Sequence, residues 1–375
     1  MLGRKYEERM MQDKRIGSLD GLKGLACLPI ILVHYYGAAK AINNASVQEL
    51  PFSTICGPFY KYGYIFVYLF FWISGFLCES RYRDNIKSFT VIAFLKKRMH
   101  TLYPMAFCTI TIGIGVSILD QILTSGMCVQ KPIRLLNIFL SYTLMQVGWS
   151  ESSGMMPYGS GTWFICVLFL CYILFWIINN IFHRYKYLLS FVMFLLGWVA
   201  FRGEYDIPFF TQWNGSGYCG FFGGVLLYEL LYGDFKDEFG IILKGICHSK
   251  FFSLLFLVFL CMGLFLGDNI PILMLVIYSP IVICYALEVS WIRKVLELKP
   301  FQWLGNSSMS IYMSHVHIIN LTSIVLIYFG LNFSFKSITI FIIDVLMIFC
   351  IGRPVFLLLQ KNINVFYRLW KDCNY

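Results

Sequence analysis

The sequence predicts an all-α fold: a polytopic membrane bundle of about ten transmembrane helices with one extra short helix. Only 13% of the 375 residues are charged, against about 25% in an ordinary soluble domain. Hydrophobic residues make up 58% of the chain, and its mean hydropathy is +0.69. The apolar residues are grouped in runs of about 20, the length of a helix that crosses a bilayer. A composition so poor in charge excludes a secreted soluble, a disordered or a nucleic-acid-binding protein.

The apolar runs place ten spans along the chain. They lie near 22–41, 62–79, 102–119, 162–181, 187–202, 217–232, 251–267, 271–290, 307–329 and 337–358. An eleventh run, 135–149, is short and ends in polar and aromatic residues, so we expect an interfacial or re-entrant helix there. The first 20 residues are charged and no cleavage site of small residues follows the first apolar run, which predicts a retained span.

The Lys and Arg residues predict the orientation of these spans. With ten spans and a cytoplasmic N-terminus, 24 of the 30 Lys and Arg residues fall on the cytoplasmic side, as the positive-inside rule requires. Counting 135–149 as a full span would place most of the later basic residues outside. We therefore predict a single multi-pass domain over 1–375 in the plasma or inner membrane, with cytoplasmic segments at 1–20 and 359–375.

The first span carries two polar residues on one helical face. Lys23 and His34 are eleven residues apart, which is about 16 Å along a helix and close to three full turns. Lys23 is therefore expected at the cytoplasmic edge and His34 deep in the membrane, where a polar residue is a candidate functional group. The alternatives are a buried His34 capped by a carbonyl group, or a His34 at the outer interface beside Tyr35.

The ninth span begins with a segment that is too polar to face lipid. One stripe consists of Ser307, Ser310, Ser314 and His317, and a neighbouring stripe of Ser308, His315 and Thr322. His315 and His317 fall about 13–16 Å from the cytoplasmic side, close to the depth of His34. Three histidines at one depth indicate a hydrated cavity reached from the cytoplasm. The alternative is interhelical packing by small hydroxyl residues.

The loop predicted between the second and third spans is basic. It contains Arg81, Arg83, Lys87, Lys96, Lys97 and Arg98. Such a cluster anchors lipid headgroups or binds a phosphate-rich ligand, and both interpretations stay open. Weaker signals are Glu229, Glu288, which is expected to pair with Arg293, and the mid-span Asp344, for which no partner is predicted.

Five segments in this order resemble the motifs of the acyltransferase 3 family of integral membrane proteins. They are Ser18–Leu25 running on to His34, Phe71–Leu77, Phe94–Arg98 running on to Tyr103 and Pro104, Gly161–Phe164, and Leu304–Tyr312 running on to His315. The resemblance covers about residues 15–330 and implies the stand-alone form of the family. Its members are ten-span enzymes that move an acyl group, often acetyl, from cytoplasmic acyl-CoA to a sugar hydroxyl of an envelope glycan.

By this resemblance His34 matches the catalytic histidine, and the basic segment around Arg98 matches the donor-binding region. The chain departs from the family at three positions. Lys23 replaces the usual arginine and lacks its bidentate fork; Thr101 replaces the second arginine of an Arg-x-x-Arg motif; and Leu168 replaces an acid.

These arguments give three sets of candidate residues. The catalytic set is His34, Asp20 and Lys23; the donor-binding set is Arg98, Lys97, Lys96, Tyr103 and Ser74; the cavity or acceptor set is Trp163, Tyr312, His315, His317 and Ser310. His34 is expected to act as a general base or to form a covalent acyl-histidine.

The expected donor is acyl-CoA, specifically acetyl-CoA, with no metal because no His/Cys cluster has ligand spacing. The expected partners are acyl-CoA, a glycan or other hydroxyl acceptor and the bilayer, and no nucleic acid. A transporter or flippase for a lipid-linked saccharide is the main alternative, and a catalytically inactive relative acting as a sensor is the third.

Overall fold

The fold is described from a computed structural model. It covers residues 16–129, 133–149, 158–203, 205–249, 251–255, 258, 270–331, 334–355 and 357–358.

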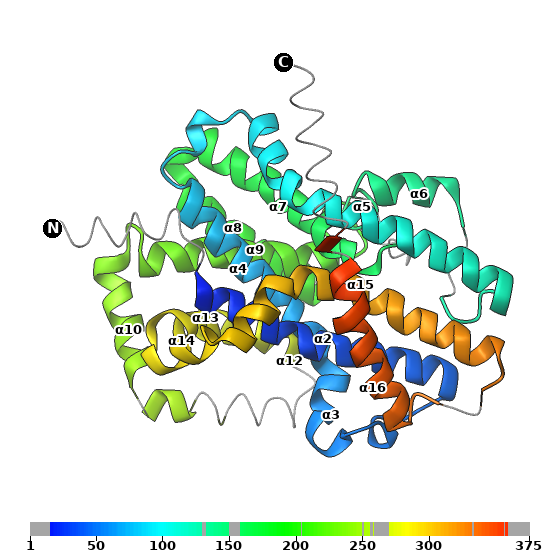
Figure 1. The fold of residues 1–375 in the computed structure, drawn as a ribbon. Coiled ribbons are helices and arrows are strands. Elements are labelled where there is room, and N and C mark those ends of the chain that lie inside the picture. The colour runs from blue at the N-terminus through cyan, green and yellow to red at the C-terminus, as the bar shows by residue number, and fades with distance from the viewer. Residues whose placement is uncertain are drawn as a thin grey trace. The chain divides into compact units, whose positions relative to one another are not determined.

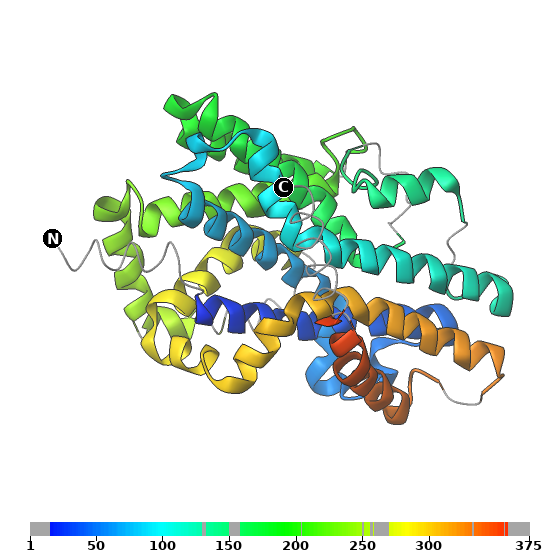
Figure 2. The same ribbon diagram turned by 45° about the horizontal axis from the view of Figure 1, so that its top comes forward.

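The described residues form helices and no strands (Figures 1 and 2), which confirms the all-α prediction. The α-helices are α2 (Gly17–Asn43), α3 (Ser53–Tyr62), α4 (Phe66–Tyr82), α5 (Val91–Thr124), α6 (Leu135–Tyr142), α7 (Trp163–Asn180), α8 (Lys186–Gly203), α9 (Gln212–Leu231), α10 (Ile241–His248), α12 (Ile270–Leu273), α13 (Ser279–Glu288), α14 (Ser290–Leu296), α15 (Lys299–Tyr328) and α16 (Ile338–Met347). Three π-helical turns interrupt or extend them: η6 (Lys236–Gly240), η7 (Met274–Tyr278) and η8 (Ile348–Gly352).

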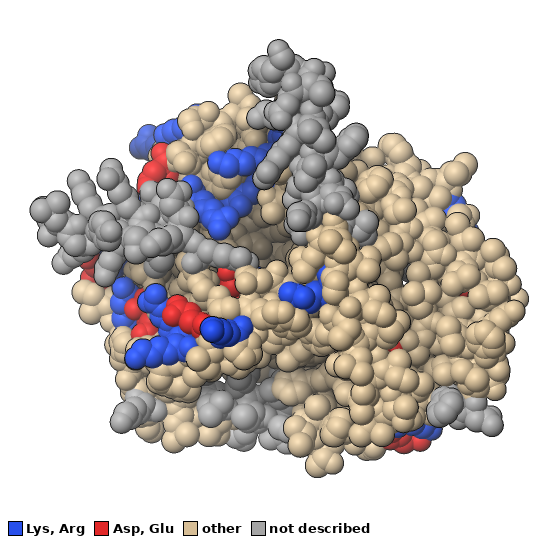
Figure 3. Space-filling view, in the orientation of Figure 1, with Lys and Arg blue, Asp and Glu red and all other residues tan. Residues whose placement is uncertain are grey.

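Eight described helical segments are long and apolar enough to cross a membrane. They are Gly17–Asn43, Ser53–Tyr82, Val91–Thr124, Ser160–Asn180, His183–Gly203, Pro271–Glu288, Lys299–Tyr328 and Ile338–Val355. The predicted span 217–232 coincides with the glycine-rich helix α9, and most of 251–267 lies outside the described residues. The short helix predicted in 135–149 is α6. Charged side chains gather on one part of the face drawn in Figure 3, and a wide area carries almost none, as suits a surface covered by lipid.

The predicted loop between the second and third spans is shorter than the sequence indicates. Thr90 accepts a hydrogen bond from the Ala93 N–H at 3.2 Å and so caps α5, which begins at Val91. The good helix formers that follow extend this helix back from the apolar run. Lys96, Lys97 and Arg98 therefore lie on a helix, and their placement in a loop is wrong.

The described chain divides into two compact units. Unit 1 consists of residues 1–26, 64–95 and 167–306, and unit 2 of residues 27–63, 96–166 and 307–375, including the undescribed residues that fall within these ranges. Helices α2, α5, α7 and α15 each contribute residues to both units.

In unit 1, glycines let α4, α8 and α9 pack backbone against backbone. A Cβ atom on Gly224 of α9 would lie 2.0 Å from the Trp72 carbonyl oxygen, and one on Gly75 of α4 would lie 1.8 Å from the Phe221 carbonyl oxygen. A Cβ atom on Gly197 of α8 would lie 2.2 Å from the Cys219 nitrogen of α9. Small residues at such contacts are typical of helix pairs in membranes, where close van der Waals packing drives association.

An ionic cluster joins the ends of the same three helices. Arg83 lies 3.0 Å from the Glu229 carboxylate, which is fully buried, and also pairs with Asp234. Burial alone would lower the pKa of Arg83, but the carboxylates of Glu229 and Asp234 outweigh it and raise the pKa above its ordinary value. A hydrogen bond from Tyr187, followed by the Arg83 charge, lowers the pKa of Asp234. Two protein carboxylates thus pair with Arg83, one of the basic residues expected to bind lipid headgroups or a phosphate-rich ligand.

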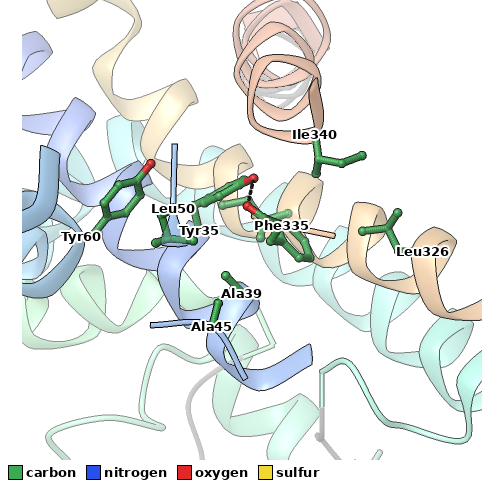
Figure 4. Packing of buried hydrophobic residues seen from close by; sticks show 9 residues of the cluster. Tyr35, Ala39, Ala45, Leu50, Tyr60, Leu326, Phe335 and Ile340 are labelled. Carbon is green, nitrogen blue, oxygen red and sulfur yellow. Dashed lines mark hydrogen bonds between the residues drawn. The ribbon is translucent and has the colours of Figure 1, made fainter. Parts of the chain in front are cut away.

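Unit 2 contains a hydrophobic core at the C-terminal end of α2 (Figure 4). The Tyr35 hydroxyl donates a hydrogen bond to the Phe335 carbonyl at 2.7 Å, and the Phe335 N–H donates to the Asn43 side chain at 2.9 Å. Lys336 forms an ion pair with Glu49 in the same region. The loop between α15 and α16 is therefore fixed to the end of α2, directly beside the turn that carries His34.

Candidate active site

Helices α2 and α15 pair in parallel, with a constant offset of 281 residues. In unit 1, Gly24 lies against Gly305. In unit 2, the Cys27 thiol donates to the Ser308 carbonyl at 3.4 Å, and His34 contacts His315. The two polar segments singled out in the sequence thus lie against each other in register (Figure 1).

Glycines make the close approach of these helices in unit 1 feasible. A Cβ atom on Gly24 would lie 2.5 Å from the Gly305 nitrogen, and one on Gly305 would lie 2.2 Å from the Asp20 carbonyl oxygen. The Asp20 side chain forms an ion pair with Lys23 at 2.6 Å, one turn along α2. Two of the predicted catalytic residues therefore pair with each other.

The central feature of the site in unit 2 is a pair of imidazole rings. The rings of His34 and His315 have centroids 4.8 Å apart and stand nearly perpendicular, at 79°. Nδ1 of His34 lies 2.8 Å from the Ile30 carbonyl oxygen and 3.3 Å from Nε2 of His315. Nδ1 of His315 lies 3.2 Å from the Ile311 carbonyl oxygen.

These contacts assign the protons of both rings. A carbonyl oxygen only accepts hydrogen bonds, so Nδ1 carries the proton in each neutral ring and Nε2 keeps its lone pair. His315 is only 1% exposed, whereas His34 is partly exposed. The arrangement therefore leaves two basic nitrogens, Nε2 of the partly exposed His34 and Nε2 of the buried His315.

Two further residues of the polar stripes on α15, Thr322 and Ser307, contact Asp344 of α16 and Arg353. Thr322 donates a hydrogen bond to the Asp344 carboxylate at 2.5 Å, which supplies the partner that the sequence did not identify. Arg353, directly after η8, donates from Nε to the Ser307 hydroxyl at 2.5 Å. In the stripe of Ser308, His315 and Thr322, the first two residues thus contact α2 and the third contacts α16.

The other predicted cavity residues are mostly buried. Tyr312 packs against Phe164 and Gly161, and Ser310 is 1% exposed. His317 faces Gly113 of α5, and Trp163, at the start of α7, is partly buried.

The predicted donor-binding residues lie in two units. In unit 2, Lys96 and Lys97 are exposed on α5 and Arg98 is partly buried, while the Tyr103 hydroxyl donates to the Tyr142 carbonyl at 3.0 Å and so links α5 to α6. Ser74, on α4 of unit 1, is partly buried.

One predicted ion pair is wrong. Glu288 accepts a hydrogen bond from the Tyr232 hydroxyl. It also lies 3.8 Å from Lys244, because α10, which carries Lys244, packs beside α13. Arg293 instead pairs with Glu297 one turn along α14. Within the described part of the chain, no group of three or more His, Cys, Asp or Glu residues is placed to hold a metal ion.

Comparison with known families decides which family the chain belongs to. The model of the acyltransferase 3 family, described as an acyltransferase domain, matches residues 16–353. The chain belongs to the acyltransferase 3 family. It is therefore a multi-pass membrane acyltransferase, and the match spans both members of the histidine pair. Neither the comparison with curated proteins nor that with solved structures gave a match.

Sequence reasoning found both histidines of this acyltransferase but not their contact. A signal for it was present: Gly24 precedes His34 by the same ten residues by which Gly305 precedes His315. Equal spacing of a small residue and a polar residue on two helices is what a parallel, in-register pair requires. The sequence contains no comparable signal for the hydrogen bonds from Arg353 to Ser307 and from Thr322 to Asp344.

Proposed function

We propose that this acyltransferase moves an acetyl group from cytoplasmic acetyl-CoA to a hydroxyl of an envelope or exported glycan, with His34 as general base. The observation that carries the proposal is the hydrogen bond from Nδ1 of His34 to the Ile30 carbonyl. It orients the ring and leaves Nε2 as the basic nitrogen of a partly exposed side chain.

The reaction then needs one proton acceptor that later becomes a donor. Nε2 of His34 takes the proton of the glycan hydroxyl while its oxygen attacks the thioester carbonyl carbon. The new C–O bond forms as the C–S bond breaks, and the proton passes from Nε2 to the departing CoA sulfur. No net proton is gained or lost, so a single imidazole suffices.

For the donor, we propose the basic start of α5. CoA carries phosphates at its nucleotide end, and the exposed Lys96 and Lys97 with the partly buried Arg98 offer three positive charges within one helical turn. Arg98 is the arginine of this segment and is expected to contribute most, since its planar fork matches a phosphate.

The first test separates donor binding from chemistry. Calorimetry on purified protein in detergent would measure binding of acetyl-CoA and of free CoA, and radiolabelled acetyl-CoA would report transfer to glycan in membrane vesicles. Replacing His34 (His34→Ala) should lower transfer by about 10²- to 10⁴-fold or more while donor binding survives. Replacing Arg98 (Arg98→Ala) should weaken donor binding, and Arg98→Lys should restore part of it.

A matched control is Arg134→Ala, which removes an exposed arginine that lies before α6 and should leave donor binding unchanged. Full transfer activity in the His34→Ala protein would contradict the role of His34. Unchanged donor affinity in Arg98→Ala would contradict the donor site. A folded wild-type protein that binds neither acetyl-CoA nor CoA would contradict the proposed function.

A further inference from the structure

The second histidine of the pair has no assigned role in the proposed reaction. His315 is 1% exposed, and Nε2, the one ring nitrogen that its own helix does not use, points at Nδ1 of His34 from 3.3 Å. The Ile311 carbonyl holds its other nitrogen. Both histidines belong to unit 2.

The protons of the two rings make this contact a directed hydrogen bond. Nδ1 of His34 carries a proton because it faces the Ile30 carbonyl, and Nε2 of His315 lacks one because the proton of that ring is on Nδ1. The His34 N–H is therefore shared between two acceptors, a carbonyl oxygen and an imidazole nitrogen. When His34 gains a second proton at Nε2, the positive charge spreads to Nδ1–H and both hydrogen bonds become charge-assisted.

We propose that His315 is a positioning residue for His34 and stabilises the imidazolium that forms on His34 during acyl transfer. The inference rests on the proposed function, since it requires His34 to act as a base. Throughout the reaction the Nδ1 proton stays on His34; only the Nε2 proton is taken from the acceptor hydroxyl and returned to the CoA sulfur. His315 neither gains nor loses a proton.

A neutral imidazole suits this position better than a carboxylate. A buried carboxylate beside His34 would incur a large desolvation cost, and its charge would favour the imidazolium before substrate arrives. An imidazole acceptor stabilises the cation only after it forms. Tyr312 and His317 are titratable groups beside His315, while Cys27, Tyr35 and Asp344 lie further along the helices.

The test compares two substitutions of similar size that differ in one acceptor. Gln at position 315 (His315→Gln) can place a carbonyl oxygen near the position of the imidazole Nε2, whereas His315→Leu offers no acceptor. Transfer of radiolabelled acetyl groups to glycan in membrane vesicles is measured as kcat against pH. In His315→Leu, kcat should fall about 10- to 100-fold and its acidic limb should move to lower pH by about one pH unit. In His315→Gln the acidic limb should stay close to that of wild type.

Binding of acetyl-CoA by calorimetry shows that each variant is folded. His248→Leu and His248→Gln, at an exposed histidine of α10 in unit 1, are the matched controls and should change neither kcat nor the limb. A His315→Leu protein with an unmoved limb would overturn the inference, because a purely structural role lowers kcat without shifting it. So would a His315→Gln protein that binds donor but behaves like His315→Leu.

A second measurement is independent of catalysis. The chain has six histidines, so nitrogen NMR of histidine-labelled protein is assignable by single substitutions. His34 and His315 should both be protonated at Nδ1 and bare at Nε2. A proton on Nε2 of His315 would overturn the inference whichever reaction the protein performs, whereas a wild-type protein that transfers no acetyl group would contradict the proposed function instead.

Discussion

Backbone carbonyls and hydroxyls, rather than opposite charges, hold His34, His315 and Asp344 in unit 2. The two histidines are oriented by the carbonyls four residues earlier on their own helices. Asp344 is held by the Thr322 hydroxyl. Neutral partners of this kind fix a side chain without burying a second charge, which would be costly in an apolar surrounding. They also leave one functional atom of His34 available for chemistry.

The sequence identified these residues but not their partners. His34, His315 and Asp344 were conspicuous because a polar group within an apolar run needs an explanation. The partner of Asp344 lies 22 residues earlier on another helix, and a threonine in an apolar helix is too common to stand out. Partners on the same helix follow from spacing, whereas partners on other helices require the tertiary fold.

The pair of Thr322 and Asp344 predicts a specific loss of stability. Replacing the threonine by its isostere (Thr322→Val) removes the donor to a carboxyl group that is 1% exposed, which should cost about 1–3 kcal/mol. The control is Thr109→Val, since the Thr109 hydroxyl donates to the Met105 carbonyl of its own helix. Thermal unfolding in detergent would report both; equal melting temperatures would contradict the prediction. Adding Asp344→Leu to Thr322→Val should cost less than the sum of the single changes.

At the scale of elements, the pairing of α2 with α15 organises the candidate site. The small residues at the N-terminal ends allow close contact in unit 1, and the same offset brings the two histidines together in unit 2. The lengths of both helices were largely predictable from hydropathy, because an apolar run of this length has no alternative in lipid. Their start points were not, since polar residues extend each helix beyond its apolar run.

This pairing predicts opposite effects for two glycines of the same helix. A side chain at Gly24 would collide with the backbone of Gly305, whereas a Cβ atom at Gly37 meets nothing within 4 Å. Replacing the first (Gly24→Ala) should destabilise the protein and lower acyl transfer, because neither backbone can give way cheaply. Replacing the second (Gly37→Ala) should raise stability by about 0.5–1 kcal/mol through the helix propensity of alanine. Melting temperatures of the two variants would decide; a Gly24→Ala protein as stable as Gly37→Ala would show that the helices do not touch there.

At the scale of the whole molecule, the parallel pairing bears on the number of spans. Parallel helices enter the membrane from the same side, so an odd number of spans must separate them along the chain. In the ten-span prediction α2 is the first span and α15 the ninth, which satisfies this condition. The contact of Lys336 with Glu49 places the loops that follow these two helices together, as the same count requires. The class of fold was therefore accessible from composition and charge, while the pairing of helices was not, because hydropathy carries no information on which apolar faces meet.

The topology leads to a labelling experiment on whole cells. Cysteines at the paired positions (Glu49→Cys and Lys336→Cys, made separately) should both react with a membrane-impermeant maleimide in intact cells, after Cys56→Ser and Cys128→Ser remove two native thiols of the predicted outer side. A cysteine in the connection between α4 and α5 (Lys87→Cys) should react only after permeabilisation, because the positive-inside count places it in the cytoplasm. The exposed ion pair lost in the first two variants is worth little, so the fold should persist. Different labelling of positions 49 and 336 would contradict the contact between the two loops. Labelling of position 336 together with position 87 would contradict the ten-span count, and with it the access of His34 to a cytoplasmic donor.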